Sequence, residues 1–414
     1  IMKVRLDVAF YDEDEKELFK TNYPEEFERI NKIAEVGYIE VSFADFKTYS
    51  QMQHRNSEIE KLNSFRAIQQ NIGDLYGNVN VYTDFDPESG RFSSIYTNNN
   101  EQNHVSESIG CGGVLSVLGA IYGLTQADWQ RINIQGHKDF DFDSAVIENF
   151  DKMLVVEAKG SIVEDNRVKS DLSNHKNRIK AKKEDEDFKN KYPNGADLLI
   201  GGITAIDDVN HAKVYLVDPP MNSNISKEFR FKIKTLKRLT YYLDWLTIIS
   251  SRSYLTIALK NRINAIEKLD NIENLNALML VNAKDEVLEM REFFFESKSH
   301  IDKQVFGKLH ILNSKKAVFI GLAAELYDLI AFQNFDAICK YKTESFMEGK
   351  PIRLKISRRE AESLDFLNNI NIDFEETKSN TFNFVVVDAI VFQNSAGINY
   401  SILTPKNSYY TSYE

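Results

Sequence analysis

Residues 153–160 limit what this chain can fold into more than any other part of the sequence. They read Met-Leu-Val-Val-Glu-Ala-Lys-Gly, an apolar run that carries two opposite charges near its end. Successive side chains of a β-strand point to opposite faces, so Glu157 and Lys159 would share one face with Val155. The pattern therefore predicts a buried strand that presents a carboxylate and an ammonium group side by side.

A strand with alternating acidic residues is predicted just upstream. Residues 138–143 read Lys-Asp-Phe-Asp-Phe-Asp, so alternation places three aspartates on one face and two phenylalanines on the other. If this strand pairs with the next one as a hairpin, Asp141 lies near Glu157. Asp139 and Asp143 share the face of Asp141 and are alternative candidates for its role.

Two neighbouring carboxylates form a poor static pair, but they suit a hard cation such as Mg²⁺, which prefers oxygen ligands and keeps several waters. Such an ion polarises a phosphoryl group and lowers the pKa of the water bound to it. Lys159 would orient or activate that water and offset charge on the phosphate. We therefore expect Asp141, Glu157 and the carbonyl of Ala158 to hold Mg²⁺, or Mn²⁺ as its substitute. An ordinary salt-bridged pair of strands is the alternative.

The acidic strand and the Glu-x-Lys strand together resemble the PD-(D/E)xK nuclease superfamily, whose core is a helix, a mixed sheet and a second helix. The resemblance falls on Asp141, Glu157 and Lys159, while Phe140 occupies the position that is usually proline. Many members add a glutamate from the first helix to the metal site, which assigns that role to Glu107. The resemblance implies an α/β fold with a restriction-endonuclease-like core, a mixed sheet flanked by helices.

Three short segments also look like nuclease domains encoded in bacterial anti-phage defence loci: residues 106–110, 141–142 and 157–160. That resemblance implies a metal-dependent endonuclease that hydrolyses DNA in antiviral defence. Two other functions stay open. One is an RNase on the same scaffold, and the other is a catalytically silent nuclease-fold subunit that serves assembly or nucleic-acid binding.

The order of predicted elements divides the chain into three regions. Residues 1–100 form an N-terminal α+β accessory region, residues 101–220 the nuclease-like domain, and residues 221–414 a C-terminal accessory region of mainly helical or mixed structure. The elements expected in the middle region are a helix over 105–124, strands over 138–147 and 152–159, a helix over 166–192, and strands over 196–205 and 212–217.

A glycine-rich segment, Ile109-Gly110-Cys111-Gly112-Gly113, lies inside the first of these helices. It lacks the Gly-Lys-Ser/Thr ending of a phosphate-binding loop and the spacing of a dinucleotide fingerprint. Close packing of the helix against a neighbour is the interpretation that we favour. The chain shows no motif for nucleotide hydrolysis, so an ATP-driven step would require a protein partner such as an ATPase subunit.

The helix expected after the Glu-x-Lys strand is basic, as is typical of a surface that meets phosphate. Its basic residues are Lys169, Lys176, Arg178, Lys180, Lys182 and Lys183. The candidate nucleic-acid contacts are His175, Lys176, Lys180 and Lys183. A solvated helix face is the alternative for the lysines. His175 lies on the apolar face with Leu172, where a core histidine is the alternative.

The formal net charge of −11 argues against binding of nucleic acid by the whole surface, so DNA or RNA must meet a local patch. The two cysteines, Cys111 and Cys339, match neither a disulfide framework nor a zinc motif and fit a reducing compartment. We see no apolar run of the roughly 20 residues that a membrane span needs. We therefore expect a cytoplasmic protein that does not enter membranes and consider a homo-oligomer.

Overall fold

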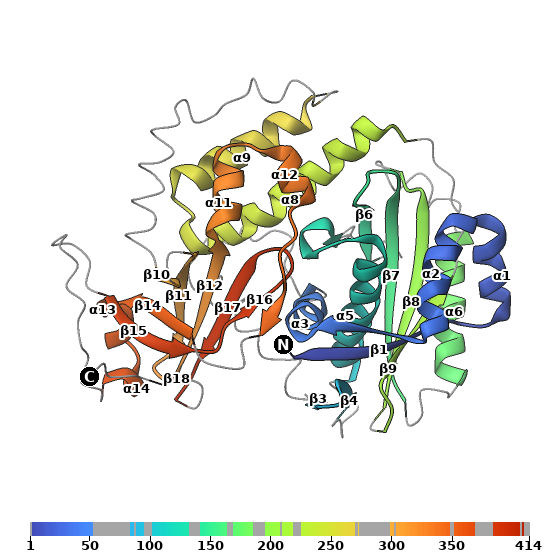
Figure 1. Ribbon diagram of the computed structural model, residues 1–414, viewed down its shortest axis with the longest axis horizontal. Helices are drawn as coiled ribbons and strands as arrows, with labels where there is room; N and C mark the ends of the chain where they lie inside the picture. Colours follow the sequence, from blue (N-terminus) through green and yellow to red (C-terminus); the bar gives the residue numbers. More distant parts are fainter. Residues whose placement is uncertain are drawn as a thin grey trace. The chain divides into compact units, whose positions relative to one another are not determined.

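The computed structural model describes residues 2–52, 83–86, 88–94, 102–131, 141–163, 169–184, 195–207, 209–217, 225–269, 272, 299–301, 304–347, 352–368, 384–405 and 408–409 (Figure 1). They form two compact units, one from within residues 2–237 and the other from within residues 238–414. These units differ from the three expected regions, which met near residues 100 and 220. The reason is that strands from the first hundred residues join the same sheet as the middle third.

Among the described residues, the first unit is built on a mixed sheet of seven strands in the order β2-β1-β9-β8-β7-β6-β5 (Figure 1). Its strands are β1 (Lys3–Phe10), β2 (Tyr38–Ser42), β5 (Gln130–Arg131), β6 (Phe142–Val146), β7 (Met153–Ile162), β8 (Leu198–Ile206) and β9 (Ala212–Val217). The pairs β7–β8 and β1–β9 are parallel, and the other neighbours are antiparallel. The expected mixed sheet is confirmed.

Helices surround this sheet: α1 (Glu13–Asn22), α2 (Pro24–Val36), α3 (Phe43–Gln51), α5 (Gln102–Tyr122), the short 3₁₀ turn η3 (Gln126–Asp128) and α6 (Lys169–Glu184). A small hairpin, β3 (Thr83–Asp86) with β4 (Arg91–Ser94), completes the described part of the unit. The helices expected over 105–124 and 166–192 correspond to α5 and α6. At the start of α1, the Asp12 side chain accepts a hydrogen bond from the N–H of Glu15 and caps the helix.

Helices α5 and α6 cover opposite faces of the sheet. Leu154 and Val156 of β7 pack in one apolar cluster with residues of α5. Ile203 of β8 packs in a second cluster with Leu172 and Ile179 of α6. Because the face of a strand residue alternates, the odd-numbered residues of β7 that follow Val155, including Glu157, lie on the side of α6.

Glycines let the backbone of α5 touch β7 directly. A Cβ added at Gly110 would lie 2.5 Å from the backbone nitrogen of Gly160, and one added at Gly160 would lie 1.7 Å from the carbonyl oxygen of Ser106. Further along α5, a Cβ at Gly113 would meet the side chain of Thr204 on β8 at 2.2 Å. The prediction that the glycine-rich segment serves close helix packing is confirmed.

Helix α5 also corrects one expectation about apolar runs. Within the described residues, Val105–Tyr122 is long and apolar enough to cross a membrane by length and composition alone. However, 83% of this window is buried inside the structure. Such burial is what a core helix shows, because its apolar surface already packs against the sheet.

Helix α8 (Lys227–Ser250) begins in the first unit and ends in the second. Its first half is tied to the end of β6, because the Nζ of Lys234 donates to the carbonyl oxygen of Val146 at 2.7 Å. The same Nζ lies 3.4 Å from Oδ1 of Asp128, and both charged side chains are almost completely buried. The second unit continues through α9 (Tyr254–Glu267).

The described strands of the second unit form an antiparallel sheet in the order β13-β16-β17-β12-β11-β10-β14-β15-β18. They are β10 (Ser299–Ile301), β11 (Val305–Asn313), β12 (Lys316–Ala323), β13 (Phe346–Met347), β14 (Ile352–Ser357), β15 (Phe384–Ala389), β16 (Phe392–Gln393), β17 (Ile398–Leu403) and β18 (Ser408–Tyr409). Its further helices are α11 (Ala324–Ala331), α12 (Phe335–Lys340), α13 (Arg358–Glu362) and α14 (Asp365–Asn368). This region is mixed rather than mainly helical.

Candidate active site

The hairpin of β6 and β7 brings Asp141 beside Glu157. Phe142 pairs with Val156 in the antiparallel ladder. Asp141 and Glu157 are the next residues along the two strands, so they lie opposite each other. The N–H of Ala158 donates to Oδ2 of Asp141 at 2.9 Å and fixes the carboxylate. The predicted hairpin and the proximity of the two strands are confirmed.

The two alternative aspartates are not placed in the same way. The side chain of Asp143 and the whole of Asp139 lie outside the described residues. The ladder shifts register between Phe142 and Ala145, so strict alternation does not continue along β6. Asp141 is therefore the acidic residue that the described structure brings to the β7 strand.

Glu157 stands at the centre of an ionic cluster. Its side chain is completely buried, at 0% exposure. The Nζ of Lys159 lies 2.5 Å from Oε1 of Glu157 and 3.8 Å from Oδ2 of Asp141. From α6, the Nζ of Lys182 reaches the same Oε1 at 2.6 Å. Two carboxylates and two ammonium groups thus meet between β7 and α6.

Burial and neighbouring charges act in opposite directions on this cluster. Burial raises the pKa of Glu157, the charge of Asp141 raises it further, and Lys159 and Lys182 lower it. Burial by itself would lower the pKa of Lys159, but the charges of Asp141 and Glu157 outweigh it and raise this pKa above its ordinary value. Lys159 is therefore held in the charged form that can stabilise an anion.

Lys182 is a member of the cluster that the sequence analysis did not assign to the site. It belongs to the basic run of α6, for which the sequence predicts either a surface that meets phosphate or a solvated helix face. It stands three residues after Ile179 and ten after Leu172, which are both buried against the sheet. Helical periodicity along this apolar face could therefore have indicated that Lys182 points toward β7.

The candidate nucleic-acid contacts lie in different environments. His175 is half-buried, and its Nδ1 has no hydrogen-bond partner within the described part of the chain. Burial lowers the pKa of His175, and the charge of Lys159 lowers it further, which places this ring within electrostatic reach of the cluster. Lys176 and Lys180 instead form ion pairs with acidic residues at the start of α1. The side chain of Lys183 lies outside the described residues.

Glu107 lies on the second turn of α5, near the point where this helix crosses β7. The close approach of Ser106 to Gly160 brings that part of the helix next to the residue after Lys159. The side chain of Glu107 is exposed. The hydrogen bonds and ion pairs that hold the site come from Ala158, Lys159 and Lys182, so a metal role for Glu107 stays a prediction.

The donor set suits a magnesium ion in part. Among the described residues, no group of three or more His, Cys, Asp or Glu side chains could hold a metal. Asp141 and Glu157 supply two carboxylates, and Oε2 of Glu157 is buried without a hydrogen-bond partner among the described atoms. An unsatisfied buried oxygen costs about 1–3 kcal/mol, and more when charged, so a cation there would remove a real penalty. Two carboxylates with a backbone carbonyl fit an ion that keeps several waters.

No protein-family model, curated protein or solved structure matches this chain.

Proposed function

We propose that this chain is a metal-dependent endonuclease that hydrolyses phosphodiester bonds of DNA. The observation that carries the proposal is the convergence of Asp141, Glu157 and Lys159 from two adjacent strands, with the Lys159 ammonium within 4 Å of both carboxylates. A chance Glu-x-Lys triplet would not need an acidic partner on the neighbouring strand. A buried carboxylate with an unsatisfied oxygen adds a reason for a cation at this place.

The order of elements supports a restriction-endonuclease-like core. The chain runs from α5 through β5, β6 and β7 to α6 and β8, and β8 returns parallel to β7. Helices α5 and α6 lie on opposite faces of the mixed sheet. This order is similar to the helix, mixed sheet and second helix of the PD-(D/E)xK superfamily, and this similarity supports the proposal.

In this proposal Asp141, Glu157 and the carbonyl of Ala158 would hold Mg²⁺, which polarises the phosphoryl group when it is bound. Lys159 orients the attacking water and offsets negative charge that grows on the phosphate. The N–H of Ala158 keeps Asp141 in place, and Lys182 positions Glu157. Water adds across a P–O bond, which leaves a phosphomonoester and a free hydroxyl group.

DNA as the substrate and antiviral defence as the role rest on the resemblance of the three sequence segments. The proposal predicts that bacteria carrying the chain with its genomic neighbours resist phage infection. Glu157→Ala should abolish this resistance, and an immunoblot should accompany the test because loss of the buried carboxylate also destabilises the protein. Unchanged protection would contradict the defence role. The hydrolytic activity is tested separately by the cleavage assay.

One observation favours a second candidate function, the catalytically silent subunit. The two carboxylates and two lysines of the cluster compensate each other, and Oε1 of Glu157 already contacts both ammonium groups. An ionic cluster of this kind can hold β7 and α6 together without a metal. Calorimetry separates the two functions, because only the nuclease should bind Mn²⁺ in the wild type and lose that binding in Glu157→Gln.

The decisive assay incubates the purified chain with duplex DNA, single-stranded DNA and RNA of one sequence, in Mg²⁺ or Mn²⁺. We expect cleavage of DNA that Glu157→Gln and Lys159→Ala each slow by at least about a hundredfold, the scale of a lost acid–base or electrostatic contribution. Glu148→Gln is the matched control, because Glu148 is an exposed carboxylate in the turn between β6 and β7. It should cleave like the wild type.

Three outcomes would change the proposal. Equal cleavage by the wild type and Lys159→Ala would remove the site assignment. Faster cleavage of RNA than of DNA would make the protein an RNase on the same scaffold. No cleavage of any substrate, together with no Mn²⁺ binding, would leave the silent subunit.

A further inference from the structure

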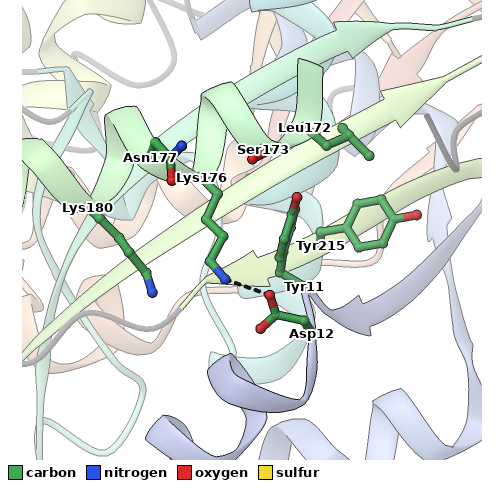
Figure 2. Close-up of a pocket in the computed structure, with 8 residues that line it drawn as sticks. All are labelled: Tyr11, Asp12, Leu172, Ser173, Lys176, Asn177, Lys180 and Tyr215. Carbon is green, nitrogen blue, oxygen red and sulfur yellow. Dashed lines mark hydrogen bonds and ion pairs between the residues drawn. The ribbon is translucent and has the colours of Figure 1, made fainter. Parts of the chain in front are cut away.

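A cavity of about 660 Å³ lies on the side of α6 that faces α1 (Figure 2). Its walls come from α6, from Tyr215 on β9, and from Tyr11 and Asp12, which follow β1. Cavities of roughly 300–1,000 Å³ are typical of sites for small molecules. All of its walls belong to the first unit.

The cavity is distinct from the candidate active site. Lys180 lines the cavity and Lys182 contacts Glu157. Two residues along an α-helix correspond to a rotation of about 200°, so these two lysines leave α6 on opposite sides. The helix therefore separates the cavity from the ionic cluster on β7.

One end of the cavity is aromatic and apolar. The rings of Tyr11 and Tyr215 meet edge to face, with centroids 6.0 Å apart and an angle of 64° between their planes. Leu172 adds an apolar surface from α6 beside them (Figure 2). Ser173 lines the cavity as well and adds a hydroxyl group from α6 (Figure 2). Such a wall suits a flat ring that carries polar edges.

The other end of the cavity is charged, with Asp12, Lys176 and Lys180 in its wall. The Nζ of Lys176 lies 2.6 Å from Oδ2 of Asp12 and 3.1 Å from Oε1 of Glu15. The Nζ of Lys180 lies 2.5 Å from the same oxygen of Glu15. Glu15 is fully buried and does not line the cavity, so the groups that meet it are the two ammonium groups and the carboxylate of Asp12.

These lysines are suited to accept an anion. An ammonium group has three N–H donors, while the ion pairs described here use two carboxylate oxygens for Lys176 and one for Lys180. Asp12 and Glu15 already hold both side chains in place, which reduces the entropy that a ligand would lose by ordering them. Asn177 of α6 also lines the cavity and adds a polar side chain (Figure 2).

We propose that this cavity binds a nucleotide, with its ring against Tyr11 and Tyr215 and its phosphate at Lys176 and Lys180. An inorganic anion would use only the end with the two lysines, and an apolar ligand would use only the aromatic end. The nucleotide can be a free mononucleotide or one unit of a single strand. The second source rests on the proposed nuclease function, whereas the first does not.

Isothermal titration calorimetry with adenosine 5′-monophosphate, adenosine and inorganic phosphate tests the proposal. We expect adenosine 5′-monophosphate to bind at least about tenfold more tightly than either fragment, because each end should contribute 1.4 kcal/mol or more, the free energy of a tenfold change. The proposal would be overturned if the nucleotide bound no more tightly than adenosine, or did not bind at all.

Two variants separate the ends of the cavity. Lys180→Gln should weaken binding of adenosine 5′-monophosphate by about tenfold and leave adenosine unchanged, as expected for one lost charge-assisted contact. Asn177→Ala is a second variant in the wall of the cavity and should weaken binding of the nucleotide to a smaller extent. Arg178→Gln is the matched control, because Arg178 is exposed on α6 and does not line the cavity. Equal affinity of the wild type and Lys180→Gln would contradict the proposal.

A single-stranded oligodeoxyadenylate distinguishes the two sources of the nucleotide. Binding at least about tenfold tighter than the mononucleotide, again lost in Lys180→Gln, assigns the cavity to a strand. Equal or weaker binding assigns it to a free nucleotide. The Glu157→Gln chain should bind adenosine 5′-monophosphate like the wild type. Nucleotide binding without cleavage of any substrate would support this site and contradict the nuclease function. Cleavage without nucleotide binding would contradict only this site.

Discussion

Glu157 is a buried carboxylate whose charge depends on two ammonium groups, and this dependence can be measured at the scale of one residue. Lys182→Met keeps the aliphatic stem but removes the ammonium group that lies 2.6 Å from Oε1 of Glu157. We expect the free energy of unfolding to fall by about 2–4 kcal/mol, because breaking a buried ion pair leaves a charge uncompensated. Urea denaturation followed by circular dichroism gives the value.

The control for Lys182→Met is the double variant that also carries Glu157→Gln. With the carboxylate gone, removal of Lys182 should cost about 1 kcal/mol or less, so the two changes would not add. Additive losses would show that the ion pair between these residues contributes no coupling energy.

His310 on β11 is fully buried, and burial, with the charge of Lys308, lowers its pKa to about 3. In the unfolded chain a histidine has a pKa of about 6.5. Below pH 6.5 the unfolded state therefore binds a proton that the folded state does not bind, so stability falls as the pH falls toward 3. Between pH 7 and pH 5 this group should contribute a loss of about 2 kcal/mol.

Measurements of unfolding at both pH values test this expectation. Between pH 7 and pH 5, the free energy of unfolding of His310→Phe should fall by about 2 kcal/mol less than that of the wild type, because phenylalanine binds no proton. His211→Gln, a change at a partly exposed histidine, serves as the control and should keep the dependence that His310 causes. The same pH dependence in the wild type and His310→Phe would contradict the assignment.

The sequence could predict some of the site residues because their signals are local. Alternation along one strand is enough to place Glu157 and Lys159 on a common face. The role of Lys182 required the periodicity of α6 to be followed to its last turn. The ion pairs that Lys176 and Lys180 make with Asp12 and Glu15 join residues more than 160 positions apart, and charge patterns within a helix do not reveal such distant partners.

At the scale of elements, the contact between α5 and β7 depends on the absence of side chains. A Cβ at Gly160 would stand 1.7 Å from the carbonyl oxygen of Ser106, which is backbone and cannot rotate away. Gly160→Ala should therefore destabilise the protein by about 3 kcal/mol, the upper part of the range for overpacking. Thermal and urea denaturation measure the change, and any nuclease activity should fall because Lys159 is the adjacent residue.

Gly37→Ala provides the comparison for this prediction. Gly37 ends α2 in the left-handed region at φ 86°, but an added Cβ would meet nothing within 4 Å. Its substitution should cost only about 1 kcal/mol, from the backbone conformation alone. If Gly160→Ala were no more destabilising than Gly37→Ala, the close approach of α5 and β7 would be wrong.

Elements with strong periodicity could be predicted, whereas their pairing across the chain could not. The hairpin of β6 and β7 follows from nearby segments with complementary alternation. The parallel pairing of β1 with β9 joins residues 6–10 to residues 212–216, and no local pattern encodes it. This pairing is the reason that the boundary expected near residue 100 does not separate two compact units.

At the scale of the whole molecule, the net charge of −11 would limit how the proposed DNA substrate binds. Lys182 of α6 pairs with Glu157, and Lys176 and Lys180 face the cavity, so few lysines of this helix remain for the backbone of duplex DNA. We therefore expect few phosphate contacts, so the logarithm of the DNA affinity should fall with the logarithm of salt concentration with a slope no steeper than about −4. Fluorescence anisotropy of labelled duplex DNA with Glu157→Gln, which should not cleave it, measures the slope.

A much steeper slope would require a broad cationic surface and would contradict the expectation of a local patch. Lys180→Gln should leave the duplex slope unchanged if the cavity takes free nucleotide, since duplex backbone would not enter it. A slope that becomes shallower by about one unit would instead place Lys180 on the path of the DNA backbone.

Helix α6 belongs to two ionic assemblies at once, through Lys182 on one side and through Lys176 and Lys180 on the other. A ligand that binds the cavity lysines acts on the same helix that carries Lys182, the counter-ion of Glu157. Thermodynamic reciprocity then sets a strict relation between the two sides. Whatever factor a nucleotide imposes on metal affinity at Glu157, the metal must impose on nucleotide affinity in the cavity.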